Sequence, residues 1–139
     1  MKNRVFLDTS FSIALAIAKD EFHTKANQLA EQLTDAKSQI FTTGAVILEI
    51  GNALSRRKYR QSATGIIRRL QSEQNTSIVA VTDELFDEAF DLFQNRPDKN
   101  WSIVDCISFV VMQERGIVCA LTTDEHFVQA GFRALLRED

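Results

Sequence analysis

The sequence predicts an α/β fold: a three-layer α/β/α sandwich around a central, mostly parallel sheet of four to five strands. Two observations support this prediction. Short apolar segments rich in Val, Ile and Leu alternate along the chain with longer segments whose apolar residues recur at helical spacing. Strands that alternate with helices pair in parallel, because each crossover helix returns the chain to the same edge of the sheet. With 139 residues, the chain fits one domain over residues 1–139.

The expected strands are short, apolar and rich in β-branched residues, which favour an extended backbone. The sequence Ser-Ile-Val-Ala-Val shows this pattern most clearly. The strands are expected at residues 4–7, 39–42, 77–81 and 117–121, with residues 133–136 as a fifth strand at the sheet edge. Sheets of this kind bind ligands beyond the carboxyl ends of their strands. The residues that follow the strands are therefore the first candidates for a functional site.

The expected helices have apolar residues three or four positions apart, which together form one buried face. They are expected at residues 10–18, 23–36, 45–57, 63–74, 103–115 and 125–130, with another that follows Thr82 or Asp83 and includes residues 85–93. Gly116 ends the helix expected at residues 103–115, since glycine readily adopts the backbone conformation of a C-terminal cap. Residues 96–100 form a polar loop, and the phenylalanines of residues 86–93 belong to the core or to a dimer interface.

Composition argues against several classes of protein. The apolar stretch at residues 5–18 is shorter than the roughly 20 residues of a membrane-spanning helix and contains Asp8, so we expect a cytoplasmic protein with no membrane attachment. Cys106 and Cys119 lack CxxC spacing, which argues against a zinc site. The net charge of −3 lacks the basic excess typical of nucleic-acid enzymes. A bound metal that neutralised acidic residues would remove this objection.

Four acidic residues stand alone in uncharged surroundings: Asp8, Glu49, Asp105 and Asp124. Ionised carboxylates are rarely buried unless they are paired or bind metal, and no basic residue adjoins any of the four. Asp8 and Asp124 follow strands, and Glu49 lies in the helix after the second strand. Asp105 opens the helix before the fourth strand. In a parallel sheet, all four can converge over one edge.

Each acid also has a purely structural interpretation, and these alternatives stay open. Asp8 can form a turn that caps the next helix. Glu49 can lie on the exposed face of its helix. Ser102-x-x-Asp105 matches a capping box, in which the acid accepts a hydrogen bond from a backbone amide. Asp124 can cap the short helix behind it.

If the four carboxylates converge, their repulsion either raises their pKa values sharply or requires a cation. Two such charges about 5 Å apart repel by roughly 3 kcal/mol at an effective dielectric near 20. A site made only of oxygen ligands suits Mg²⁺, with Mn²⁺ as a substitute. Since no nucleophilic side chain is evident, the expected attacking group is metal-bound water. Hydrolysis of a phosphodiester bond is the reaction that such a site serves best.

The acids stand in four segments that resemble the motifs of PIN domains, and in particular of the VapC-type toxins of bacterial toxin–antitoxin pairs. The segments are Val-Phe-Leu-Asp-Thr-Ser (5–10), Val-Ile-Leu-Glu-Ile-Gly-Asn-Ala-Leu (46–54), Trp-Ser-Ile-Val-Asp-Cys-Ile-Ser-Phe (101–109) and Ala-Leu-Thr-Thr-Asp-Glu-His-Phe (120–127). Gln-Ala-Gly-Phe (129–132) is also similar. Each motif alone is weak, but the ordered set spans the whole chain.

This resemblance implies a PIN-like sandwich and a metal-dependent endoribonuclease specific for single-stranded RNA. The family's acidic quartet corresponds to Asp8, Glu49, Asp105 and Asp124. Asp8 and Asp105 match the residues most regularly assigned to Mg²⁺, and the other two complete the metal shell or orient water. The family's hydroxyls match Thr9 and either Thr122 or Thr123. The resemblance also implies a homodimer and a small antitoxin, often one that blocks the acidic pocket with a basic side chain.

Two further groups of residues are candidates for RNA contact. Arg56 and Arg57 open the strongest basic concentration in the chain, which either contacts phosphate or is a solvated helix end. Lys99 and Trp101 flank the third acid and can meet RNA by charge and by stacking, or the indole packs beneath the loop. His126 is a candidate phosphate contact.

Two competing functions remain open. A phosphoryl-accepting receiver or phosphatase also places an essential Asp after a strand. A receiver, however, needs a second acid beside it and a Lys after the last strand, and the phosphatase needs acids two positions apart, where this chain has Asp8 and Ser10. The other alternative is a catalytically silent or non-toxin PIN domain that only binds nucleic acid or a partner.

Overall fold

The computed structural model describes residues 3–139, so residues 1 and 2 of the predicted domain lie outside the described residues. The strands are β1 (Arg4–Leu7), β2 (Gln39–Thr43), β3 (Thr76–Val79), β4 (Cys119–Leu121) and β5 (Arg133–Ala134). The helices are α1 (Thr9–Ala16), α2 (His23–Asp35), α3 (Gly44–Ala53), α4 (Arg60–Ser72), α5 (Asp83–Asn95), α6 (Ile103–Arg115) and α7 (Glu125–Gln129), followed by the 3₁₀ turn η1 (Leu135–Arg137).

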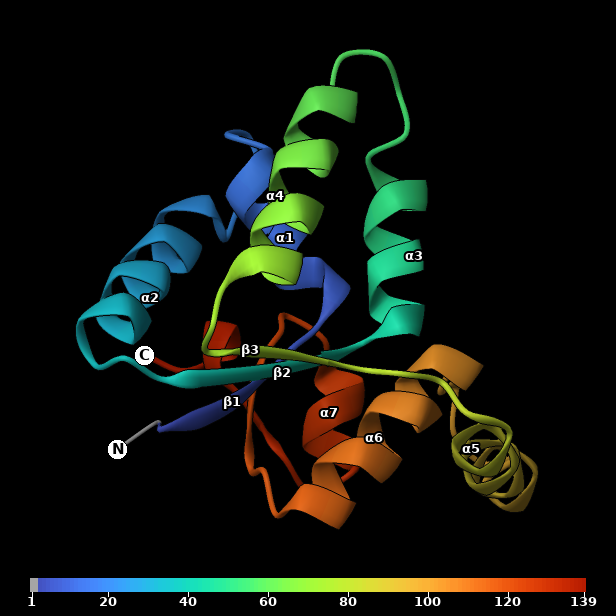
Figure 1. Ribbon diagram of the computed structural model, residues 1–139. Helices are drawn as coiled ribbons and strands as arrows, with labels where there is room; N and C mark the ends of the chain where they lie inside the picture. Colours follow the sequence, from blue (N-terminus) through green and yellow to red (C-terminus); the bar gives the residue numbers. More distant parts are fainter. Residues whose placement is uncertain (1–2) are drawn as a thin grey trace.

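The strands form one parallel sheet in the order β3-β2-β1-β4-β5. In Figure 1, helices α1 to α4 cover one face of the sheet and α5 to α7 cover the other. This arrangement confirms the predicted three-layer α/β/α sandwich with a parallel sheet. No helix within residues 3–139 has the length and apolar character needed to cross a bilayer.

Polar caps begin three of the helices as the sequence suggests. Thr82, rather than Asp83, caps α5 by accepting a hydrogen bond from the Leu85 amide, and Ser102 caps α6. Asp124 caps α7. Gly116 ends α6 in the left-handed region with φ of 65°, as predicted, because a residue with a Cβ pays a steric cost there.

Several predicted boundaries are wrong: for example, β4 begins at Cys119 rather than at residue 117, and β3 ends at Val79 rather than at residue 81. The helix expected at 45–57 ends at Ala53, and α4 begins at Arg60 rather than at residue 63. Leu54 turns into the core, and a turn closed by the Tyr59 amide on the Arg56 carbonyl separates the two helices. At the sheet edge, β5 stops at Ala134, because the next two leucines turn inward and are buried in η1.

The position of β1 determines where the site forms. β1 lies at the centre of the sheet with β4 beside it, and Leu7 pairs with Leu121. The chain continues the pairing one step further, since the Asp8 amide donates to the Leu121 carbonyl at 3.2 Å. The residues that follow the two strands, Asp8 and Thr122, therefore lie side by side at the carboxyl edge of the sheet.

Candidate active site

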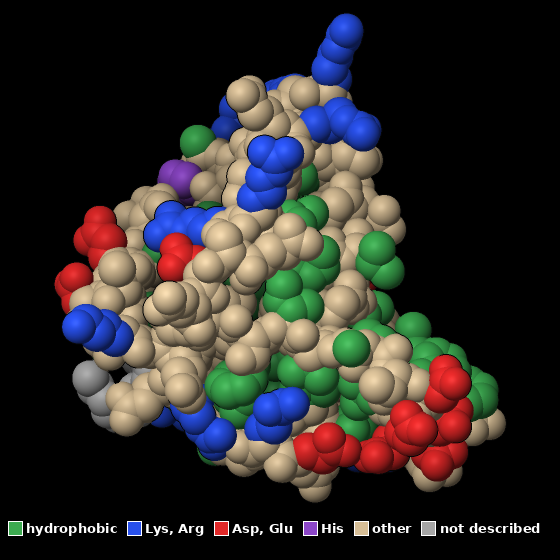
Figure 2. All heavy atoms as spheres, in the orientation of Figure 1, with side chains coloured by type: hydrophobic (Ala, Val, Ile, Leu, Met, Phe, Trp, Pro, Cys, Tyr) green, Lys and Arg blue, Asp and Glu red, His purple; other side chains and the backbone are tan. Residues whose placement is uncertain are grey.

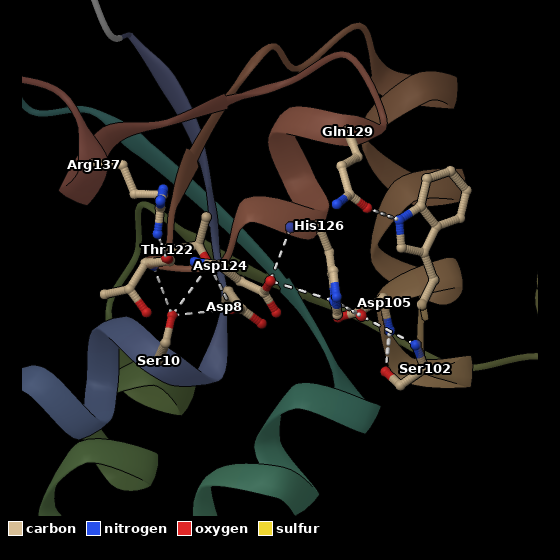
Figure 3. A network of polar contacts seen from close by, with 11 residues as sticks. Asp8, Ser10, Ser102, Asp105, Thr122, Asp124, His126, Gln129 and Arg137 are labelled. Carbon is tan, nitrogen blue, oxygen red and sulfur yellow. Dashed lines mark hydrogen bonds and ion pairs between the residues drawn. The ribbon is translucent and has the colours of Figure 1, made fainter. Parts of the chain in front are cut away.

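Asp8 is held by two hydroxyls, one from a residue two positions later and one from a distant part of the chain. Its side chain is buried, and its Oδ2 accepts hydrogen bonds from Thr122 Oγ1 at 2.7 Å and Ser10 Oγ at 3.1 Å. The same hydroxyls also accept: the Asp124 amide donates to Thr122 Oγ1, and the Thr123 amide donates to Ser10 Oγ. These contacts tie the ends of β1 and β4 together (Figure 3).

The environment of Asp8 opposes its ionisation. Its pKa is raised from 3.8 to about 6, mainly by burial and with a smaller contribution from the charge of Asp105, while the hydrogen bond from Thr122 opposes the shift. A carboxyl group buried in this way releases its proton most readily when a cation replaces it. The local structure therefore favours a bound positive charge next to Asp8.

Asp105 has the capping role that the sequence allowed, and it also lines the same cavity as Asp8. It forms a complete capping box with Ser102: the Ser102 amide donates to Asp105 Oδ2 at 3.1 Å, and the Asp105 amide donates to Ser102 Oγ at 3.0 Å. The same Oδ2 lies 3.0 Å from His126 Nδ1. Burial raises the pKa of Asp105 and nearby Asp124 adds to the increase, whereas the hydrogen bonds from Ser102 and His126 oppose it.

The other two acids are each anchored through one oxygen. Asp124 Oδ1 accepts the His126 amide at 2.8 Å as the cap of α7, so the predicted capping role is also correct. Glu49 Oε1 accepts the Thr9 hydroxyl at 2.8 Å across the gap between α3 and α1. Within residues 3–139, hydrogen bonds engage one oxygen each of Asp105, Asp124 and Glu49 and leave the second oxygen for a ligand.

All four predicted acids line a single cavity of about 640 Å³. Its lining also includes Thr9, Ser10, Asn52, Ser102 and His126. One ligand atom from each of Asp105, Asp124 and His126 lies within 4.8 Å of the others, which is close enough to surround one ion. The predominance of hard oxygen donors fits Mg²⁺ or Mn²⁺ better than a thiophilic metal.

The hydroxyl residues near the acids differ in what they contact. Of the two hydroxyls that the sequence left open, Thr122 bonds to Asp8, while Thr123 contributes its backbone: its carbonyl accepts from Arg137 at 3.0 Å. Thr9 supports Glu49. Ser10 was missed, although its position two residues after Asp8 was the signal, and the contact of His126 with two acids was also missed.

The four candidate RNA contacts are not among the lining residues of the cavity. Arg56 and Arg57 are exposed in the loop between α3 and α4, and Lys99 is half-buried. The stacking role expected for Trp101 is wrong in this conformation, because the indole is only 6% exposed. The indole Nε1 donates a hydrogen bond to Gln129. Phe109 packs edge-on against the indole, and the guanidinium of Arg96 lies over the ring. The alternative interpretation, an indole packed beneath the loop, is the one observed.

Comparison with known proteins agrees with this geometry. The PIN domain family model matches residues 5–133. The chain is 31% identical over 129 residues to the 23S rRNA-specific endonuclease VapC20 of Mycobacterium tuberculosis, from strains CDC 1551 / Oshkosh and ATCC 25618 / H37Rv, with 92% of this chain and 95% of the relative covered. The crystal structure of Mycobacterium tuberculosis VapC20, a sarcin-ricin loop cleaving toxin, matches with a TM-score of 0.80 and 29% identity over 92% of this chain and 95% of that chain. The chain belongs to the PIN domain family.

Proposed function

We propose that this chain is a metal-dependent endoribonuclease that cleaves single-stranded RNA, and that it is the toxin of a toxin–antitoxin pair. The observation that carries the proposal is the convergence of four carboxylates from distant segments on one cavity. The likeness to VapC20 supports the same activity. We further propose that residues 1–139 act as one domain in the cytoplasm, where the RNA substrate is found.

Asp8, Glu49, Asp105 and Asp124 would hold the metal, which we propose to be Mg²⁺ with Mn²⁺ as a substitute. A divalent cation supplies activation of water and stabilisation of the charge on the phosphate. The protein prepares the site by fixing the acids before the ion arrives: hydroxyls hold Asp8 and Glu49, and a capping box holds Asp105. Preset ligands lose little freedom on binding, which favours affinity.

We propose that Arg56, Arg57 and Lys99 contact the RNA backbone. The arginines are exposed in the loop directly after α3, the helix that carries Glu49 and the cavity residues Asn52 and Ala53. A strand that leaves the cavity along α3 would meet this loop. Figure 2 shows a concentration of basic side chains at this end of the molecule. Cationic side chains at such a position attract phosphate without selecting sequence.

A homodimer is proposed through the exposed apolar face formed by α3 and α5. On α5, the stacked rings of Phe86, Phe90 and Phe93 are 42–44% exposed. Leu48 on α3 is 71% exposed, and Val81 extends the apolar surface between the two helices, next to Gly44. Contiguous apolar surface of this kind on a soluble chain marks an interaction site.

Charge at the two ends of this face favours a second copy with antiparallel α3 helices. The basic loop follows the C-terminal end of α3. The acidic side chains of α5 lie beside the N-terminal end of α3 (Figure 2). The acidic residues of α5 are Asp83, Glu84, Asp87, Glu88 and Asp91. A twofold axis near Leu48 would place the basic loop of each copy against the acidic helix of the other.

We propose that a small antitoxin inhibits the enzyme by inserting a basic side chain into the acidic cavity. Among the described residues, the cavity lining includes no Lys or Arg of this chain. A cationic side chain from a partner would offset the same repulsion that a metal offsets, and would occupy the same space.

The sarcin-ricin loop of 23S rRNA is the proposed substrate, because the similar protein VapC20 is a sarcin-ricin loop cleaving toxin. The test incubates intact ribosomes and an oligonucleotide of that loop with the wild type and with Asp105→Asn, in Mn²⁺ and in EDTA. We expect cleavage by the wild type in Mn²⁺ only. Equal cleavage by the variant would reveal a contaminating nuclease and overturn the proposal. Cleavage of unrelated single strands but not of this loop would retain the enzyme and reject the substrate.

A further inference from the structure

His126 lies between two of the candidate metal-binding carboxylates. Its Nδ1 lies 3.0 Å from Asp105 Oδ2 and 3.3 Å from Asp124 Oδ1. The imidazole comes from α7 and Asp105 comes from the first turn of α6, so this one ring links two helices at the rim of the cavity (Figure 3). Ionised carboxylates only accept hydrogen bonds, so Nδ1 carries a hydrogen.

The imidazole hydrogen-bonds to Asp105 and lies at ion-pair distance from Asp124. Asp105 Oδ2 has a second donor, the Ser102 amide, and Asp124 Oδ1 accepts a hydrogen bond from the backbone amide of His126 itself. Asp105 is thus held through one oxygen by a backbone amide and by a hydrogen bond from the imidazole, whereas Asp124 is held by a backbone amide with the same Nδ1 at ion-pair distance. The other oxygen of each is left for a ligand, and its direction depends on how the first oxygen is held.

A nitrogen that carries hydrogen cannot also ligate a metal, because ligation uses the lone pair of that nitrogen. The position of Nδ1 therefore suits a donor that supports the ligands. Groups that hydrogen-bond to metal ligands commonly control metal affinity, and their loss typically lowers that affinity 10–100-fold.

We propose that His126 is a positioning residue: Nδ1 donates to Asp105 and lies 3.3 Å from Asp124, and the ring thereby keeps the free oxygens of the two acids at the separation that a divalent cation needs. This inference rests on the proposed metal site. It replaces the phosphate contact expected for His126 with a role toward the acids.

The first test is calorimetric titration of Mn²⁺ into the wild type and three variants. His126→Ala removes the donor and should weaken Mn²⁺ binding by about 10–100-fold. His126→Asn places an amide nitrogen close to the position of Nδ1 and should retain most of the affinity. His23→Asn is the matched control, because His23 contacts the Ala14 carbonyl and is not among the lining residues of the cavity. Thermal unfolding of each variant checks that it is folded.

The second test is ¹⁵N NMR of the imidazole rings in the metal-free protein and after addition of Mg²⁺. We expect a hydrogen on Nδ1 of His126 in both states. A bare Nδ1, or loss of its hydrogen when Mg²⁺ binds, would make His126 a ligand and overturn the inference. Equal Mn²⁺ affinity of wild type and His126→Ala would also overturn it, as would an Asn variant as weak as the Ala variant. In all these cases the proposed function stands, whereas a wild type that binds no Mn²⁺ would overturn the proposed function itself.

Discussion

Thr122 Oγ1 lies 2.7 Å from Asp8 Oδ2, although 114 positions separate the two residues in the chain. The contact exists because β1 and β4 are neighbours in the sheet and both end at this point. A fully buried hydroxyl thus supports the most deeply buried acid of the cavity, and it links the fold directly to the proposed chemistry.

Replacement of Thr122 by Val should destabilise the protein in a pH-dependent way. Hydrogen bonds to charged groups contribute about 1.5–3 kcal/mol, so the loss at pH 7.5, where Asp8 is ionised, should be of this order. At pH 4.5 Asp8 is protonated and the loss should be smaller. Urea unfolding at the two pH values measures the difference. Thr42→Val is the matched control, because the buried Thr42 hydroxyl donates to the neutral Leu7 carbonyl. Losses for Thr122→Val that are equal at the two pH values would contradict the prediction.

The raised pKa of Asp8 predicts that the metal-free protein loses stability as pH rises. The folded state binds this proton more tightly than the unfolded chain, so ionisation between about pH 4 and 7 disfavours the folded state. The shift from 3.8 to about 6 corresponds to roughly 3 kcal/mol.

Asp8→Asn removes this ionisation and isolates its effect. In EDTA, the variant should match the wild type near pH 3, below the unfolded pKa of Asp8, and exceed its free energy of unfolding by roughly 3 kcal/mol at pH 7.5. With Mn²⁺ at 100 times its dissociation constant, only the wild type should gain about 2.7 kcal/mol. A difference between the two proteins that does not change with pH would argue against a raised pKa.

Replacement of Arg56 and Arg57 by Ala should weaken RNA binding mainly at low salt. Each phosphate contact to single-stranded RNA contributes about 0.7 to the slope of log affinity against log salt, so losing two should reduce the slope by about 1.4. Binding is measured in the Asp105→Asn background to avoid cleavage. Lys37→Gln serves as control, because Lys37 precedes β2 and therefore lies at the amino ends of the strands, whereas the cavity lies at their carboxyl ends. An unchanged slope would show that Arg56 and Arg57 do not contact RNA phosphates.

Phe90→Glu should convert a dimer into a monomer. The charge would be placed in the middle of the apolar stripe on α5, and burying it against a second copy is unfavourable. Sedimentation velocity should give twice the chain mass of 15.7 kDa for the wild type and for Val118→Glu, since Val118 is exposed outside this face. A wild type that sediments as a monomer, or a Phe90→Glu protein that remains dimeric, would exclude the proposed interface.

The sequence predicts the convergence of the acids on one cavity well where chemistry and topology coincide. Asp8 and Asp124 follow adjacent parallel strands, so alternation of strands and helices already places them at one edge. Asp105 shows that a capping role does not exclude a place in the cavity lining, since the capping box and the cavity use the same side chain.

The remaining features depend on contacts that a one-dimensional pattern does not contain. The choice between Thr122 and Thr123 depends on which side chain faces inward after β4. The burial of Trp101 depends on Phe109 and on Gln129, which lies 28 positions away. The end of α3 depends on burial of Leu54, whereas helical periodicity alone continues into the basic loop.

The most direct test of a cation held by these acids is the anomalous scattering of Mn²⁺ in crystals grown at pH 7.5. We predict an anomalous peak in the cavity about 2.1 Å from carboxylate oxygens that include those of Asp8 and Asp105, and no peak in Asp8→Asn crystals. Ordered carboxylates without a peak between them, in crystals of the wild type saturated with Mn²⁺, would contradict the account.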